Sequence, residues 1–254
     1  MSRSCVRCGK SLYARNKTDL CTPCKTKIGA AIRRIGLNQI KLATGCADCG
    51  YRAHPDALVF SHVRGEGRQS VALLLNCAWQ RVLDEIAKCD VACANCHSIR
   101  NTLRLREEFR DHQHARGSAG YLARRVVVSQ VKLAAGCTDC GYQAHAEALQ
   151  FDHGDDEEKV AGIGRMTGSA RNDLAAEMVK CAVRCANCHA IRTAKAAGWV
   201  RAGSCGWDGI SEASRNWALG RAWEAGVTDE RAVAAVVASA LAGHTPDQVA
   251  APSP

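Results

Sequence analysis

Six C-x2-C pairs constrain the fold of this chain more than any other feature of its sequence. The pairs are Cys5/Cys8, Cys21/Cys24, Cys46/Cys49, Cys93/Cys96, Cys137/Cys140 and Cys185/Cys188. Two thiolates at this spacing can reach one ion from a tight turn, which is typical of tetrahedral zinc. The pairs therefore predict up to three structural Zn²⁺ ions.

A disulfide framework is the competing interpretation of so many thiols. The N-terminal residues MSRSCVRCGK contain no apolar export signal, which favours zinc and a reducing, cytoplasmic environment. No apolar run approaches the ~20 residues that a membrane span needs, so we expect no membrane partner. Cys89 and Cys181 each stand four residues before a predicted ligand. We interpret them as small buried thiols; the alternative is that each replaces one of the predicted zinc ligands.

The middle of the sequence is duplicated. Residues 38–62 match residues 129–153, and residues 85–101 match residues 177–193, with offsets of 91 and 92. Two tandem copies of one module explain this pattern most simply. Each copy is only about sixty residues long, so a structural zinc would have to stabilise it.

The composition divides the chain into four predicted segments. These are a zinc ribbon or finger (1–28), the first copy (29–118), the second copy (119–200) and a helical C-terminal region (201–254). Within each copy we expect a helix, a knuckle with the first cysteine pair, a short strand ending in His, a helix, a second knuckle and a final helix. The predicted class is α+β, built from small zinc-stabilised modules.

Positive charge is concentrated near the N-terminus. Residues 1–41 contain ten Lys or Arg against the single acidic residue Asp19, which accounts for the whole net charge of +9. Such clusters are typical of proteins that bind the phosphate backbone of DNA, with a solvated surface as the plain alternative. The residues we would neutralise first are Arg3, Arg7, Lys10, Arg15, Lys17, Lys25 and Lys27.

The second copy resembles a known family. Its Cys137, Cys140, Cys185 and Cys188, the Asp152-His153 doublet, Lys159, and His189 after the last cysteine resemble the HNH, or ββα-metal (His-Me finger), endonucleases of the zinc-stapled phage-type branch. The resemblance implies DNA as partner and, for a phage-encoded protein, the host cytosol as location. It also implies that His153 is a general base and that Asp152 and His189 hold one Mg²⁺ or Mn²⁺ ion.

Several parts of the family pattern stay open. Asp152 and His153 are neighbours in a strand, so they can face one cleft only at a twisted strand end. Asn172 and Asn187 are candidates for the Asn that orients the base in the family, although each has a local structural alternative. Lys159 is either a phosphate contact or a solvated lysine.

The first copy departs from the pattern, because Ser61 replaces the carboxylate while His62 and His97 remain. A neutral hydroxyl is a poor Mg²⁺ ligand, so we expect a degenerate module kept for folding and DNA binding. If both sites are vestigial, the chain is a zinc-dependent nucleic-acid-binding protein, which is the alternative to an endonuclease.

The C-terminal region carries helical signals at 211–226, 229–243 and 245–251. It has few arginines, which favours a packing or oligomerisation element, with Trp217 and Trp223 docked on another surface. A homodimer or a phage protein as partner stays open.

Overall fold

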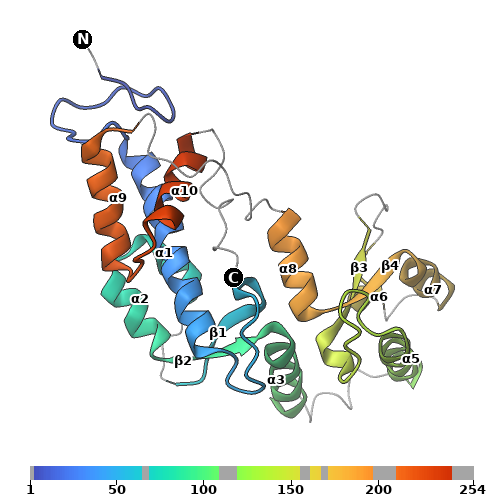
Figure 1. The fold of residues 1–254 in the computed structure, drawn as a ribbon. Coiled ribbons are helices and arrows are strands. Elements are labelled where there is room, and N and C mark those ends of the chain that lie inside the picture. Colours follow the sequence, from blue (N-terminus) through green and yellow to red (C-terminus); the bar gives the residue numbers. More distant parts are fainter. Residues whose placement is uncertain are drawn as a thin grey trace.

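The structure is a computed structural model that describes residues 3–64, 69–108, 119–154, 161–166, 171–196 and 210–241. Its described part contains two separate antiparallel two-stranded sheets among helices, which confirms the α+β prediction. The first sheet pairs β1 (Leu58–His62) with β2 (Cys89–Cys93), and the second pairs β3 (Leu149–His153) with β4 (Cys181–Cys185). Figure 1 shows the two sheets in separate lobes.

Helices surround both sheets. In the first copy they are α1 (Thr22–Thr44), η1 (Pro55–Ala57), η2 (Val71–Asn76), α2 (Trp79–Ile86) and α3 (Ala94–Glu108). In the second copy they are α5 (Ala119–Ala135), η3 (Ala146–Ala148), α6 (Ile163–Met166), α7 (Arg171–Val179) and α8 (Ala186–Ala196). The C-terminal region supplies α9 (Glu212–Glu224) and α10 (Glu230–Leu241). Each copy thus has two strands followed at once by a helix.

Helix α1 is the centre of the larger lobe. Pro23 stands in its first turn, and the helix ends before Gly45, whose φ of 72° few other residues adopt readily. Ile28 and Ile32 are completely buried, one helical turn apart, and both belong to a core shared with α9 and α10. The predicted boundary at 28/29 falls inside this continuous helix.

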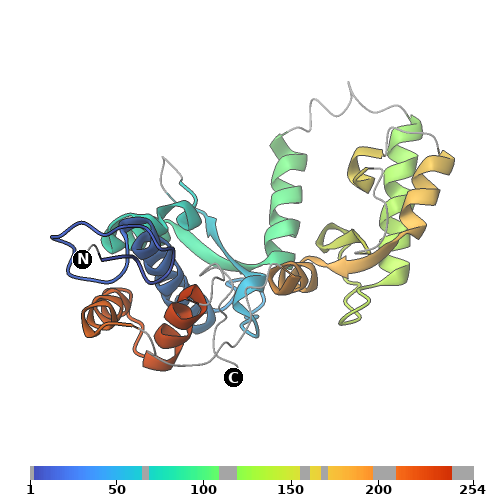
Figure 2. The same ribbon diagram turned by 90° about the horizontal axis from the view of Figure 1, so that it is seen from above.

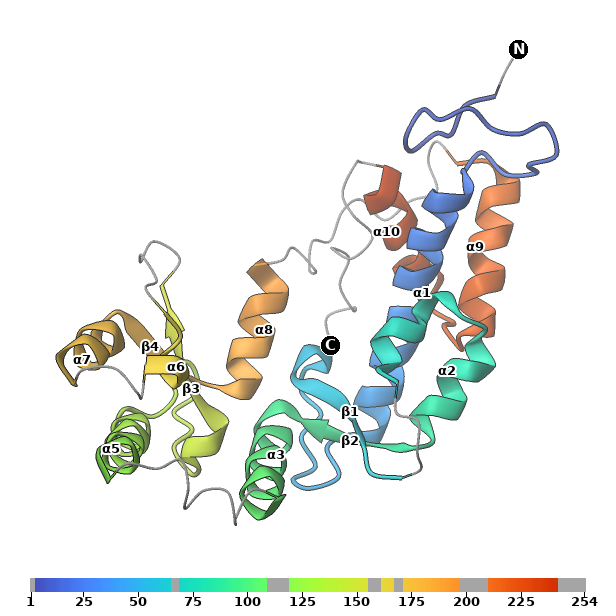
Figure 3. The ribbon, with the colours of Figure 1, turned by 180° about the vertical axis from the view of Figure 1, so that it is seen from behind.

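The C-terminal helices pack on α1 (Figure 3). A side chain at Gly36 would place its Cβ 2.5 Å from the carbonyl oxygen of Ala225, so glycine permits this close approach. Trp217 packs against the shared core as predicted, but Trp223 is 80% exposed, so its predicted docking is wrong. The predicted third helix, 245–251, lies outside the described residues.

The two copies contact each other through their last helices. Helices α3 and α8 lie between the two sheets (Figure 2), and each packs against the 3-10 turn of the other copy. At the centre, the backbone N–H of Asn95 donates to Asn187 Oδ1 (3.0 Å), and the N–H of Asn187 donates to Asn95 Oδ1 (2.9 Å). The contact is therefore reciprocal, as in a two-fold dimer.

In the described part of the chain, the helices are all too short or too polar to cross a membrane.

Candidate metal centres and catalytic site

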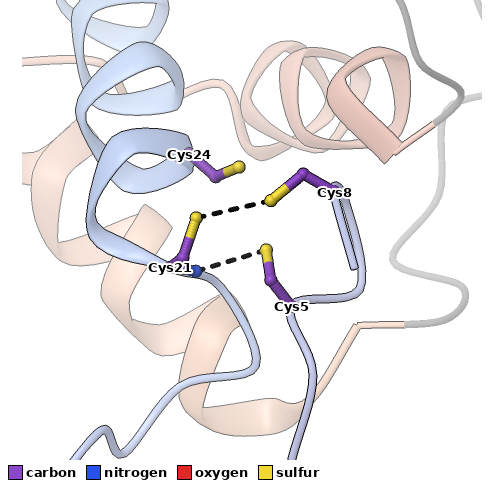
Figure 4. Close-up of side chains that lie close together, drawn as sticks. All are labelled: Cys5, Cys8, Cys21 and Cys24. Carbon is purple, nitrogen blue, oxygen red and sulfur yellow. Dashed lines mark hydrogen bonds between the residues drawn. The ribbon is translucent and has the colours of Figure 1, made fainter. Parts of the chain in front are cut away.

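The predicted zinc ligands gather into three groups of four cysteines. They form an N-terminal cage (Cys5, Cys8, Cys21, Cys24), a first-copy cage (Cys46, Cys49, Cys93, Cys96) and a second-copy cage (Cys137, Cys140, Cys185, Cys188). Within each cage, all sulfur atoms lie within 4.8 Å of one another. Figure 4 shows the four side chains of the N-terminal cage pointing toward one another.

The sulfur spacing fits a zinc ion. Zn–S bonds of ~2.3 Å in a tetrahedron separate the sulfurs by about 3.8 Å. The observed separations are 3.6 Å for Cys8 and Cys21, and 3.8 Å both for Cys49 with Cys93 and for Cys140 with Cys185. The three cages are thus compatible with three structural zinc ions, as the cysteine spacing predicts.

Backbone amides favour the thiolate form of one cysteine in each cage, whereas burial raises the pKa of other cysteines there. Burial alone would raise the pKa of Cys46 and Cys137, but hydrogen bonds from backbone N–H groups lower both to about 7. In Cys5, too, burial raises the pKa, but backbone hydrogen bonds outweigh it and lower the pKa to about 6. Zinc binds the thiolate, so these amides favour metal binding.

The N-terminal unit is a turn and a helix rather than a ribbon of strands. Cys5 and Cys8 lie in a turn flanked by the single bridge Ser4–Ser11, while Cys21 caps α1 and Cys24 lies in its first turn. The only acidic residue of this unit, Asp19, accepts a hydrogen bond from the N–H of Ser211 (2.9 Å) and contacts the Ser214 hydroxyl. These contacts fix the unit to α9.

Asp152 and His189 converge beside the second-copy cage. Asp152 lies in β3 and His189 in the first turn of α8, directly after Cys188, and Asp152 Oδ1 is 3.5 Å from His189 Nε2. Two guanidinium groups also donate to Asp152 Oδ2, Arg184 at 2.9 Å and Arg192 at 3.1 Å. Asp152 is 8% exposed and is largely shielded from water, whereas the side chains of His189 and Arg192 are 35% and 32% exposed.

His153 faces the other side of the sheet. Its Nε2 donates to Glu177 Oε1 at 2.7 Å, and Glu177, on α7, is 2% exposed. Lys180 Nζ holds the second carboxylate oxygen at 3.0 Å. Because β3 is paired regularly through His153, neighbouring side chains alternate and the Asp152-His153 doublet does not share one cleft.

Glu177 and Lys180 were missed by the sequence analysis. Their signal was the repetition of E-x2-K in both copies, since Glu85 and Lys88 occupy the equivalent positions. His62 Nε2 lies 2.7 Å from Glu85 Oε1, as in the second copy. The Lys88 ammonium, the Gln69 N–H and His62 together lower the pKa of Glu85 to about 2.

Of the two asparagine candidates, only the side chain of Asn187 is described, and its hydrogen bond is to the other copy rather than to the predicted base. Asn187 joins the two copies, as shown above, and is 8% exposed. Asn172 lies in α7, but its side chain, like Lys159, lies outside the described residues. The thiols of Cys89 and Cys181 each donate to the carbonyl of a glutamate one turn earlier (3.4 Å) and belong to no cage.

The equivalent site of the first copy lacks a counterpart of the Asp152 carboxylate, and Asp90 stands opposite Ser61 across the sheet instead. His97 corresponds to His189, and burial and the nearby Arg100 lower its pKa. Ser61 stands where Asp152 stands in the second copy. Arg100, equivalent to Arg192, instead binds Asp48, with its Nε 3.0 Å from the carboxylate.

Comparisons of the chain with protein-family models, with curated proteins and with solved structures gave no match.

Proposed function

We propose that the chain is a metal-dependent DNA endonuclease of the HNH type, with its complete site in the second copy. The supporting observation is that Asp152 Oδ1 lies 3.5 Å from His189 Nε2 where β3 meets α8, beside a four-cysteine cage. A strand carboxylate and a helix imidazole at this junction fit the ββα-metal pattern that the sequence resembles.

The donor set suits one divalent cation. Asp152 and His189 would hold Mg²⁺ or Mn²⁺, which would neutralise negative charge developing on the phosphodiester. Arg184 and Arg192, which donate to Asp152, are close enough to turn to phosphate oxygens when a substrate is bound. These two arginines would then orient the scissile phosphate.

His153 would take the proton from the attacking water. Glu177 holds its Nε2, which leaves Nδ1 as the nitrogen that can accept a proton, following the logic of a base oriented by a buried carboxylate. Because Asp152 and His153 point to opposite faces of β3, a phosphate that meets both the cation and the base would have to lie across the end of the strand, at His153. Glu177 would thus do the orienting work that the family assigns to an asparagine.

DNA is the proposed substrate because of the charge distribution. Arg3, Lys10, Arg15, Lys17 and Lys27 are exposed on the N-terminal unit and on the start of α1. Asp19 is the single acidic residue among residues 1–28, so this unit keeps a net positive charge. Such a surface gains affinity by releasing the counterions of a phosphate backbone.

A second candidate is nucleic-acid binding without cleavage. Two observations favour it: the guanidinium groups of Arg184 and Arg192 already bind Asp152, and the first copy keeps the His-Glu-Lys cluster without any carboxylate at Ser61. The cluster therefore also has a structural role, independent of chemistry.

A plasmid assay separates the two candidates. Supercoiled DNA is incubated with zinc-loaded protein and Mg²⁺ or Mn²⁺, comparing wild type, Asp152→Asn and the matched first-copy variant Ser61→Asn. The proposal expects cleavage by wild type and Ser61→Asn and its loss in Asp152→Asn. DNA binding without cleavage by the wild type would instead favour the second candidate.

A further inference from the structure

We propose that the two copies are the halves of an intramolecular pseudo-dimer, and that the chain therefore breaks one strand of a DNA duplex and leaves the other intact. This inference rests on the endonuclease function proposed for the second copy. It adds the product of the reaction and the number of chains that are needed.

The contact between the copies has the form of a two-fold interface. Equivalent residues exchange equivalent bonds, since Asn95 and Asn187 each donate a backbone N–H to the side chain of the other. Both asparagines are buried, at 7% and 8% exposure. Helix α3 lies on η3 while α8 lies on η1, so the larger contacts are also exchanged.

Two equivalent tyrosines follow the same symmetry, Tyr51 in the first copy and Tyr142 in the second. Both tyrosines line one cavity between the two copies. The two cages therefore face each other across the pseudo-two-fold axis.

An isologous interface is closed, because each partner uses the same patch to bind the other. Here the patch of each copy is covered by the other copy of the same chain. A second chain is not needed to bring two modules together, so the active species is a monomer.

The symmetry of DNA then assigns one module to each strand. The two antiparallel strands of a duplex are related by two-fold axes perpendicular to it, so a protein with a matching axis presents equivalent sites to both strands. The second copy offers Asp152 and His189, while the first offers Ser61 and His97. Only the strand that reaches the second copy is cut.

Restoring the first site tests this directly. Ser61 pairs with Asp90 across the first sheet, whereas Asp152 pairs with Ala182 across the second. An aspartate at 61 would therefore face a like charge, which destabilises a strand pair. The variant is accordingly Ser61→Asp with Asp90→Ala, and its controls are Asp90→Ala alone and Ser61→Asn with Asp90→Ala.

The experiment follows supercoiled plasmid over time with Mn²⁺ at several protein concentrations. Wild type and both controls should give open circles, with linear DNA only after unrelated nicks accumulate and with an initial rate proportional to chain concentration. Ser61→Asp/Asp90→Ala should give linear DNA together with the first open circles. Zinc content and thermal unfolding check that each variant is folded.

Each remaining outcome overturns the inference in a recognisable way. If wild type produces linear DNA early and Asp152→Asn does not, single-strand cleavage is contradicted. The endonuclease function itself would still hold. A rate that rises with the square of protein concentration contradicts the monomer, even if the double variant does not fold. If the double variant is folded but still gives only open circles, the claim that each module acts on one DNA strand is contradicted. Wild type that cuts nothing removes the proposed function and this inference with it.

Discussion

The two copies keep the same scaffold but differ at the carboxylate of the proposed metal site. Both have a four-cysteine cage at one end of a two-stranded sheet, and both hold a histidine against a buried glutamate at 2.7 Å. The second copy has Asp152 beside His189, while the first has Ser61 in the equivalent position. The cage and the His-Glu contact therefore belong to the fold of the module, and the carboxylate belongs to the proposed chemistry.

The arginines show how one substitution changes its surroundings. In the second copy Arg192 donates to Asp152, and Arg184 bridges Asp152 and Asp139. In the first copy the equivalent of Arg192, Arg100, pairs with Asp48. Without a carboxylate at 61, the Arg100 guanidinium group binds Asp48 instead.

Loss of zinc should have the largest effect and should strike both copies alike. We expect Cys93→Ser and Cys185→Ser each to lose one bound zinc and to unfold their own module, because apparent zinc binding energies in small modules are roughly 10–16 kcal/mol at neutral pH. Zinc content and circular dichroism would measure this. A Cys185→Ser protein with full zinc content and an unchanged melting curve would contradict the structural role of the cage.

Removing the histidine at the strand end should slow cleavage in the second copy but not in the first. His153→Ala should reduce cleavage roughly 10²–10⁴-fold, as expected for loss of a general base, while His62→Ala should leave the rate nearly unchanged. Both variants remove the same contact with a buried glutamate, so their stabilities should fall together. Equal cleavage rates in the two variants would argue against His153 as the base.

Glu85 should make the stability of the first copy depend on pH. In the folded state the pKa of Glu85 is lowered from 4.5 to about 2, so its charge stabilises the fold above pH 4.5 and this contribution is lost as pH falls toward 2. The stability difference between wild type and Glu85→Gln should shrink over that range. Denaturant titrations at fixed zinc would measure it, and a difference independent of pH would contradict the assignment.

Breaking the contact between the copies should have the smallest effect. Asn95→Ala and Asn187→Ala should each cost about 1 kcal/mol, since each removes one reciprocal hydrogen bond. Denaturant titrations of the two single variants would measure this cost, and variants as stable as the wild type would mean that these bonds do not form in solution.

Local spacing predicted much of this molecule. The C-x2-C pairs predicted the cages, because two ligands three residues apart must meet at one ion. The alternation in ALQFDH predicted β3, and the position of His189 after Cys188 predicted a helix start beside the cage. Each of these features depends on residues close in sequence.

Contacts between distant segments left little signal. Glu177 reaches His153 across 24 residues, and the only trace of this was its repetition in Glu85. The reciprocal pairing of Asn95 with Asn187 spans 92 residues, so a local reading placed Asn187 within its own turn. The predicted docking of Trp223 was wrong because helical periodicity does not say which face of α9 packs against α1.

Manganese binding tests the central claim most directly, because it does not require the DNA target. Mn²⁺ is titrated into zinc-loaded protein and followed by electron paramagnetic resonance in wild type, Asp152→Asn and Ser61→Asn. We expect a single Mn²⁺ site per chain in wild type and Ser61→Asn, and its loss in Asp152→Asn. Equal Mn²⁺ binding by Asp152→Asn and wild type, or none by the wild type, would contradict a catalytic cation held by Asp152 and His189.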